Sequence, residues 1–166
     1  MTSELTTVEV VIPGRDELRV VVDVPADWET SLVEEPPLFL AQIPQDQAGP
    51  FGDNLIVTIE ALEDDAPRDL EELQGLIYAQ AFSSVPDFHA VDDRPHEVAA
   101  APGWFRASLQ TAPPGITAMN RQVFTLRGDL LVTLSLTTMA FRDPEASELF
   151  DAVVASCGIL SEKESD

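Results

Sequence analysis

The chain has 166 residues, and 30 acidic residues against 9 basic ones give it a formal net charge of −21. Such a charge repels phosphate backbones and anionic lipid head groups, so nucleic acid and membrane surfaces are poor partners. A chain of this length suits one domain that removes about 70% of its unfolded surface from water. The single cysteine, Cys157, allows neither an intramolecular disulfide nor a thiolate cluster for zinc.

The sequence shows no targeting or membrane segment. It begins MTSELTTVEV, without the basic and apolar regions of a secretory signal, and its longest apolar stretch, LLVTLSLTTMAF, is too short for a membrane helix. We therefore expect a cytoplasmic protein. The polar residues 1–7 and 161–166 are predicted to be tails on either side of one domain at 8–160.

The first two predicted strands form a hairpin. Residues 8–12 and 18–24 are rich in β-branched side chains, and a Pro-Gly pair between them suits a tight turn. Pro25 is expected to end the second strand, because proline cannot donate to a sheet ladder. Trp28 follows after two residues, and we expect it to fold back over the sheet edge and to be largely buried beside Pro25.

Two further strands and a helix come next. Residues 38–43 and 54–62 alternate as strands on either side of the loop PQDQAGPFGD. The stretch 65–85 then changes to helical spacing, with a proline suited to the first turn and several acids at the positive end of the helix dipole. Its predicted apolar face consists of Leu70, Leu73, Leu76, Ile77, Ala81 and Phe82.

The last part of the chain predicts more strands and a final helix. Strands are expected at 88–91, 104–111, 118–126 and 130–139. Asp143 is expected to cap the helix and Pro144 to open it. Its buried stripe would contain Ala146, Leu149, Phe150, Val153, Val154 and Cys157. The prediction is an α+β domain: a central, mostly antiparallel β-sheet of six or more strands flanked by at least two helices.

Several of these stretches resemble the PsbP-like and Mog-like superfamily. The early P-x-x-W from Pro25 to Trp28 is similar to its first landmark, and FGDNLIVTIEAL is similar to a strand of its actinobacterial lipoprotein branch. The order of the later elements, through APGWF, TLRGDLLVTLSLT and a last helix ending ASCGI, is also similar. The sequence carries no signal peptide or lipobox cysteine of the lipoprotein branch.

This resemblance covers about residues 8–160 and implies an α/β/α sandwich with a central antiparallel sheet. Photosystem assembly proteins, Ran-binding proteins, bacterial lipoproteins and secretion-effector chaperones share that fold. The resemblance brings no catalytic or binding residues with it, because members use different surfaces.

The stretch PDFHAVDDRPH contains both histidines and is the sharpest candidate for chemistry. His89, Asp92, Asp93 and His96 are residue types that ligate divalent metals, so a metal-dependent enzyme is one alternative. They cross a strand end and a proline-broken loop, which gives no fixed ligand geometry, and we expect no specific metal. No cofactor or nucleotide motif is present, and the RGD at 127–129 is predicted to be a turn between strands.

The leading hypothesis is a non-enzymatic protein-binding module, such as an adaptor or a secretion-type chaperone. Phe51, Trp104 and Ile116, assigned to Pro/Gly-rich loops, are the candidate anchors, with loop packing as the alternative. The expected partner is an unknown protein with a basic surface around an apolar segment, and a homo-oligomer is also open. A second hypothesis is a small-molecule-binding protein with a pocket between sheet and helix.

Overall fold

The computed structural model describes residues 4–47, 49, 51–113 and 115–161, which form two antiparallel sheets and two α-helices. The smaller sheet has the order β1-β2-β10, with bounds β1 (Leu5–Ile12), β2 (Arg15–Pro25) and β10 (Gly158–Ser161). The larger sheet has the order β3-β4-β5-β9-β8-β7-β6. Its strands are β3 (Glu29–Glu34), β4 (Pro37–Gln42), β5 (Asn54–Ala61), β6 (His89–Pro95), β7 (Gly103–Ala112), β8 (Ile116–Arg127) and β9 (Leu130–Met139).

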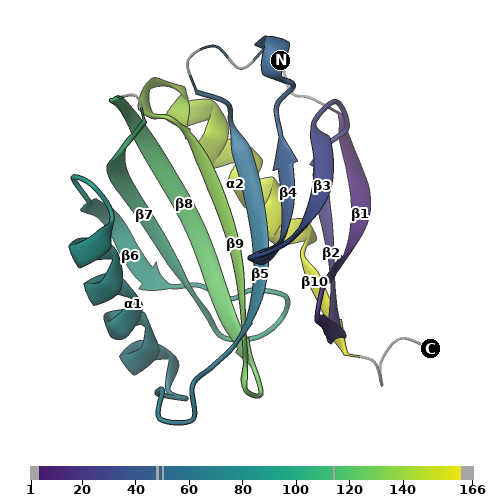
Figure 1. Cartoon of the computed structure of the whole chain (residues 1–166), viewed down its shortest axis with the longest axis vertical. Helices are drawn as coiled ribbons and strands as arrows, with labels where there is room; N and C mark the ends of the chain where they lie inside the picture. Colours follow the sequence, from purple (N-terminus) through teal and green to yellow (C-terminus); the bar gives the residue numbers. More distant parts are fainter. Residues whose placement is uncertain (1–3, 48, 50, 114, 162–166) are drawn as a thin grey trace.

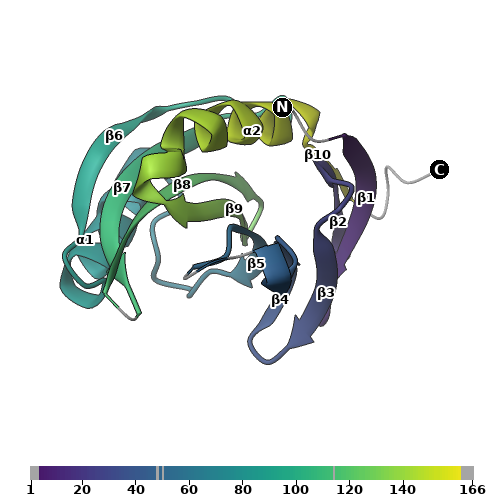
Figure 2. The ribbon, with the colours of Figure 1, turned by 90° about the horizontal axis from the view of Figure 1, so that it is seen from above.

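The helices lie against the seven-stranded sheet, as Figures 1 and 2 show. Helix α1 (Leu70–Ser84) lies beside the β6–β7 end, and α2 (Asp143–Ser156) crosses the sheet and reaches β2. Two short 3₁₀ helices, η1 (Gln45–Gln47) and η2 (Ala140–Arg142), lie at the top of Figure 1. The predicted α+β class and antiparallel sheet of six or more strands are confirmed, although β1, β2 and β10 form a sheet of their own.

The two faces of the larger sheet bury different residues, because successive side chains of a strand point to opposite faces. On β7, Phe105 and Ala107 join the main core, which lies between the two sheets and α2. Trp104 of the same strand packs in a second cluster with Leu73 of α1. The sheet therefore has α2 and the smaller sheet on one face and α1 on the other.

The structure corrects the apolar face predicted for α1. Leu70, Leu73 and Ile77 do pack against the sheet, but Leu76 and Phe82 are 43% and 68% exposed. The cause is a tertiary contact: the polar residue Gln74 faces the sheet, where it accepts hydrogen bonds from the guanidinium of Arg106 on β7. The contact face is rotated accordingly around the helix.

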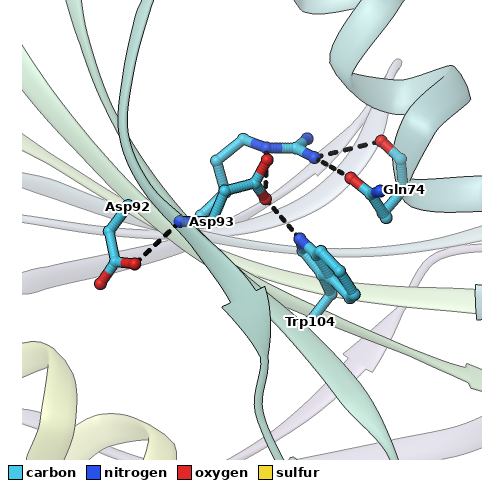
Figure 3. Close-up of polar contacts among 5 residues, drawn as sticks. Gln74, Asp92, Asp93 and Trp104 are labelled. Carbon is cyan, nitrogen blue, oxygen red and sulfur yellow. Dashed lines mark hydrogen bonds and ion pairs between the residues drawn. The ribbon is translucent and has the colours of Figure 1, made fainter. Parts of the chain in front are cut away.

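The side chain of Arg106 is fully buried. Its Nη2 donates to the backbone oxygen of Gln74 at 3.1 Å and to Oε1 of Gln74 at 2.6 Å, and its Nε donates to Asp93 at 3.2 Å. Asp93 also accepts from the indole of Trp104 (Figure 3). The ring of Tyr78 lies 5.0 Å from the guanidinium. Since a buried charge is costly unless it is paired, this network fixes α1 on β6 and β7.

Four local predictions also need correction. Strand β1 begins at Leu5, so residues 5–7, predicted as tail, pair with residues 23–25 of β2. Ser161 belongs to β10, while residues 162–166 lie outside the described part. Strands β3 and β10 were not predicted. Asp143 does not cap α2: Arg142 occupies that position, and the Asp143 carboxylate accepts two hydrogen bonds of 2.8 Å from Arg121 of β8.

Candidate functional site

A pocket of about 350 Å³ opens at the end of the molecule that is uppermost in Figure 1. The turn between β2 and β3, the loop between β4 and β5, the end of β9, η2 and the first turns of α2 all contribute to it. We call it the Trp28 pocket, after the indole that forms one of its walls. None of the residues predicted to bind a metal lines it.

The P-x-x-W stretch builds one side of this pocket. Pro25 is buried and ends β2, as predicted. The backbone N–H of Trp28 donates to the carbonyl oxygen of Pro25 at 3.1 Å and closes a tight turn. Trp28 packs against the main core but is only half-buried, because it also lines the pocket. Trp28 thus lies beside Pro25, with part of its surface exposed at the pocket.

A buried carboxylate lies at the pocket. Asp53, in the loop before β5, is 5% exposed, and its Oδ2 forms an ion pair of 2.8 Å with Arg142. Burial raises the pKa of Asp53; the nearby guanidinium lowers it, and the carboxylate of Glu145 raises it. Removal from water is the largest of these effects. Sequence reasoning missed this residue, since an Asp in a Pro/Gly loop usually indicates a turn.

Two oxygen atoms at the pocket have no hydrogen-bond partner within the described part of the chain. They are Oδ1 of Asp53 and Oγ1 of Thr138, a β9 residue that is 2% exposed. Buried polar atoms in proteins are nearly always hydrogen-bonded, and an exception requires an explanation such as a ligand. Because both residues line the pocket, these two atoms make it a place for a hydrogen-bonding group.

The pocket is acidic. Among the described residues that line it, Asp27, Asp53, Glu145 and Glu148 are carboxylates and Arg142 is the one basic residue. Three of the carboxylates are exposed, and the fourth is the buried Asp53. The opening therefore presents negative charge to solvent, while the cation inside is already paired.

An exposed aromatic residue stands next to the pocket. Phe141 in η2 is 78% exposed and immediately precedes Arg142. It is also the most exposed of the large apolar side chains in the described part of the chain. Strand β9 ends at Met139, as the predicted range 130–139 has it, and the chain turns there into η2.

A second cavity, of about 740 Å³, lies between α2, β10 and the hairpin at 96–101. His96 and Cys157 are among its lining residues. Burial raises the pKa of Cys157 to about 11, so its thiol stays protonated at neutral pH and behaves as a core side chain. Ala99 and Ala100 have φ values of 50° and 63°, which alanine rarely adopts.

The structure disperses the candidate metal ligands. Asp92 pairs with Arg94 at 3.1 Å, and Asp93 belongs to the network around the buried Arg106 that Figure 3 shows. The ring Nδ1 of His96 lies 2.7 Å from the carbonyl of Glu97, and His89 is exposed at the start of β6. In the described residues no group of three or more His, Cys, Asp or Glu side chains is placed to hold a metal ion.

The predicted partner anchors are each half-buried and lie in different places. Phe51 is in the loop between β4 and β5, the same loop that supplies Asp53 to the Trp28 pocket. Trp104 and Ile116 lie in β7 and β8 rather than in loops, and Trp104 packs against α1. The RGD tripeptide forms the turn between β8 and β9, with Gly128 at φ 61°, as predicted.

No protein-family model and no curated protein matches this sequence. Several solved structures match nearly the whole chain. Cyanobacterial PsbP from Synechocystis has 13% identity and a TM-score of 0.65, with 96% of this chain and 95% of that chain covered. LpqN of Mycobacterium tuberculosis, involved in cell envelope biogenesis, has 11% identity and a TM-score of 0.69, with 95% and 92% covered. The Ran-binding protein Mog1p of Saccharomyces cerevisiae has 11% identity and a TM-score of 0.61, with 96% and 98% covered.

The chain has a PsbP/Mog-like fold. This confirms the resemblance that the P-x-x-W stretch and the order of elements indicated. At such low identity the likeness concerns the fold alone and assigns no function to the Trp28 pocket. No helix in the described part is long and apolar enough to cross a membrane.

Proposed function

We propose that this protein is a non-enzymatic protein-binding module, acting as an adaptor or a secretion-type chaperone, and that its partner docks on the end carrying the Trp28 pocket and Phe141. The observation that carries the proposal is an aromatic side chain, 78% exposed, beside a pocket with a half-buried tryptophan wall. Interfaces obtain most of their binding energy from a few such aromatic side chains and the pockets next to them.

The charge of the chain indicates the kind of partner. A net charge of −21 attracts a basic surface and speeds its encounter, and an apolar segment on the partner would cover Phe141. A second copy of the chain would bring the same acidic surface to the contact and be repelled. We therefore favour a different protein, with a basic surface around an apolar segment, over a homo-oligomer.

Two further observations support a binding role rather than an enzymatic one. The histidines and aspartates that could have formed a catalytic metal centre are paired elsewhere or lie apart. Cys157 has a pKa of about 11, so near neutral pH it is a protonated thiol and a poor nucleophile. Mog1p, a structure with this fold, is described as a Ran-binding protein, an example of protein binding on the same scaffold.

Site-specific photocrosslinking tests the proposal. A photoreactive benzoyl-phenylalanine placed at position 141 should give a discrete adduct with a partner protein in the native cell. The same residue at position 82 is the matched control, because Phe82 is also exposed but lies on α1 and lines no part of the pocket. Equal adducts at both positions, no adduct at 141, or an adduct with a second copy of the chain would contradict the proposed docking surface.

The 740 Å³ cavity favours small-molecule binding as the second candidate function. Its volume lies within the usual range of ligand pockets, and it lies between a sheet and a helix, as the sequence hypothesis requires. A ligand that binds only the folded state raises the melting temperature. A metabolite screen by thermal shift, with no adduct at position 141, would favour this alternative.

A further inference from the structure

We infer that the Trp28 pocket recognises an aliphatic ammonium or guanidinium group, and that the partner proposed above inserts a lysine or arginine side chain there. The inference rests on the proposed function and names the chemistry of the contact. It is carried by two buried oxygen atoms that lack partners, by the charge of the lining residues and by the shape of the pocket.

The unpartnered atoms indicate a hydrogen-bond donor. When the Asp53 carboxylate is ionised, its Oδ1 can accept hydrogen bonds but cannot donate one. The hydroxyl oxygen of Thr138, Oγ1, can both accept and donate. An ammonium group has three donors and no acceptor, and a guanidinium has five donors. Either group can donate to both kinds of oxygen atom, whereas an acceptor such as a phosphate or a carboxylate cannot donate to Oδ1 of Asp53.

The charge of the pocket indicates a cation. Four carboxylates line it against one guanidinium, and that guanidinium is already bound to Asp53 at 2.8 Å. An anion would have to compete with Asp53 for Arg142 and would approach past the exposed Glu145 and Glu148. A cation, by contrast, is attracted by the exposed carboxylates and can form an ion pair with the buried carboxylate of Asp53.

The walls indicate that the cation ends an alkyl chain. Pro25, Trp28 and Leu149 line the pocket and provide apolar surface beside its carboxylates. Lysine and arginine have apolar stems that cover such surface while the charged end reaches polar groups, and a cation close to an indole ring is also attracted by the ring face. A volume of about 350 Å³ suits one side chain or a small amine.

Nuclear magnetic resonance of the two indole N–H groups tests the inference on the whole chain. The peak of Trp28 reports on the pocket, and the peak of Trp104, whose N–H donates to Asp93, is the internal control. The probes are n-butylammonium, its neutral analogue n-butanol, and butyrate. We expect n-butylammonium to shift the Trp28 peak in a saturable way and to leave the Trp104 peak in place. An equal response to n-butanol would overturn the inference, because the pocket would then recognise the alkyl chain alone.

Variants test the role of the carboxylates. Asp53→Asn should weaken binding of n-butylammonium about tenfold or more, since a hydrogen bond to a charged group is lost. The double variant Glu145→Gln, Glu148→Gln changes only exposed residues, so it keeps the test open if Asp53→Asn does not fold. It should weaken binding severalfold. Its matched control, Glu71→Gln with Glu72→Gln on α1, should leave binding unchanged. Unchanged binding in both pocket variants would overturn the inference.

A peptide separates the partner's side chain from a free amine. An acetylated and amidated Leu-Lys-Leu peptide should bind more tightly than its norleucine counterpart, which lacks only the ammonium group. If 1,4-diaminobutane binds and the lysine peptide does not, the pocket takes a free amine and the insertion of a partner side chain is refuted. A photocrosslink at position 141 that persists without any ammonium binding would refute this inference alone. Ammonium binding without a crosslink would instead refute the proposed docking of a protein.

Discussion

Gly103 gives the sharpest test of the packing. It is the first residue of β7, and a Cβ built on it would lie 2.6 Å from Cγ2 of Val98, 2.7 Å from the carbonyl oxygen of His96 and 2.9 Å from that of Phe124. Real Cβ atoms essentially never approach so closely, and two of the three obstacles are backbone atoms. The hairpin at 96–101 therefore packs on β7 only if position 103 has no side chain.

The expected effect of Gly103→Ala can be estimated from these contacts. Overpacking of a buried site costs about 1–3 kcal/mol, and backbone obstacles place this site at the upper end, about 3 kcal/mol. For a domain of this size that lowers the melting temperature by about 6–12 °C. Chain entropy alone predicts that the substitution stabilises the protein, because Gly→Ala reduces the entropy of the unfolded chain and raises the unfolding free energy by about 0.4–1 kcal/mol.

Gly75→Ala on α1 is the matched control. No atom lies within 4 Å of a Cβ built there, and the residue is exposed in the interior of a helix. It should stabilise the protein by about 1 kcal/mol. Thermal and urea denaturation of the two variants beside the wild type measure both effects. A Gly103→Ala protein as stable as the wild type would refute the packing of the hairpin against β7.

Three more predictions concern single features. Ala99→Asn with Ala100→Gly should raise the unfolding free energy by about 1 kcal/mol in urea, because this pair suits a two-residue turn with positive φ; a loss of stability would contradict that turn. Cys157, with a pKa of about 11, should react with a disulfide reagent at about pH 8 only as fast as the chain unfolds, far slower than a free peptide thiol. Asp53 has a raised pKa in the folded state, so its ionisation opposes folding, and this penalty is absent below the unfolded pKa. Asp53→Asn should therefore not destabilise the protein at pH 7, and its advantage over the wild type in melting temperature should shrink as the pH falls toward 3.8.

The sequence predicted those parts of the fold that local patterns determine. Strands β2, β5 and β9 alternate buried and partly exposed residues, so their periodicity is visible without a structure. Strand β3 lies at an edge of its sheet and has almost no buried residue, which leaves no alternation to detect. Strand β10 has only four residues, and its conformation depends on pairing with β2, far away in sequence.

The same distinction holds for the site. Pro25 and Trp28 were identified because their roles follow from neighbours in sequence. Asp53, Thr138 and Arg142 come from a loop, the end of a strand and a short 3₁₀ helix, and only the folded chain brings them together. The predicted apolar face of α1 was wrong for a similar reason, since Gln74 faces the sheet where it accepts a hydrogen bond from Arg106. A buried charge can thus override the apolar periodicity of a helix.

The position of the Trp28 pocket follows from the way the chain passes between the two sheets. Pro25 ends β2 in the smaller sheet, and after the turn at Trp28 the chain enters β3 of the larger one. The start of α2 and the loop before β5 line the pocket at this crossing. Replacing the partly buried ion pair of Asp53 and Arg142 by apolar side chains would often leave the protein as stable or make it more so. Stability therefore does not account for the buried carboxylate at this crossing, and recognition of a cation from outside does.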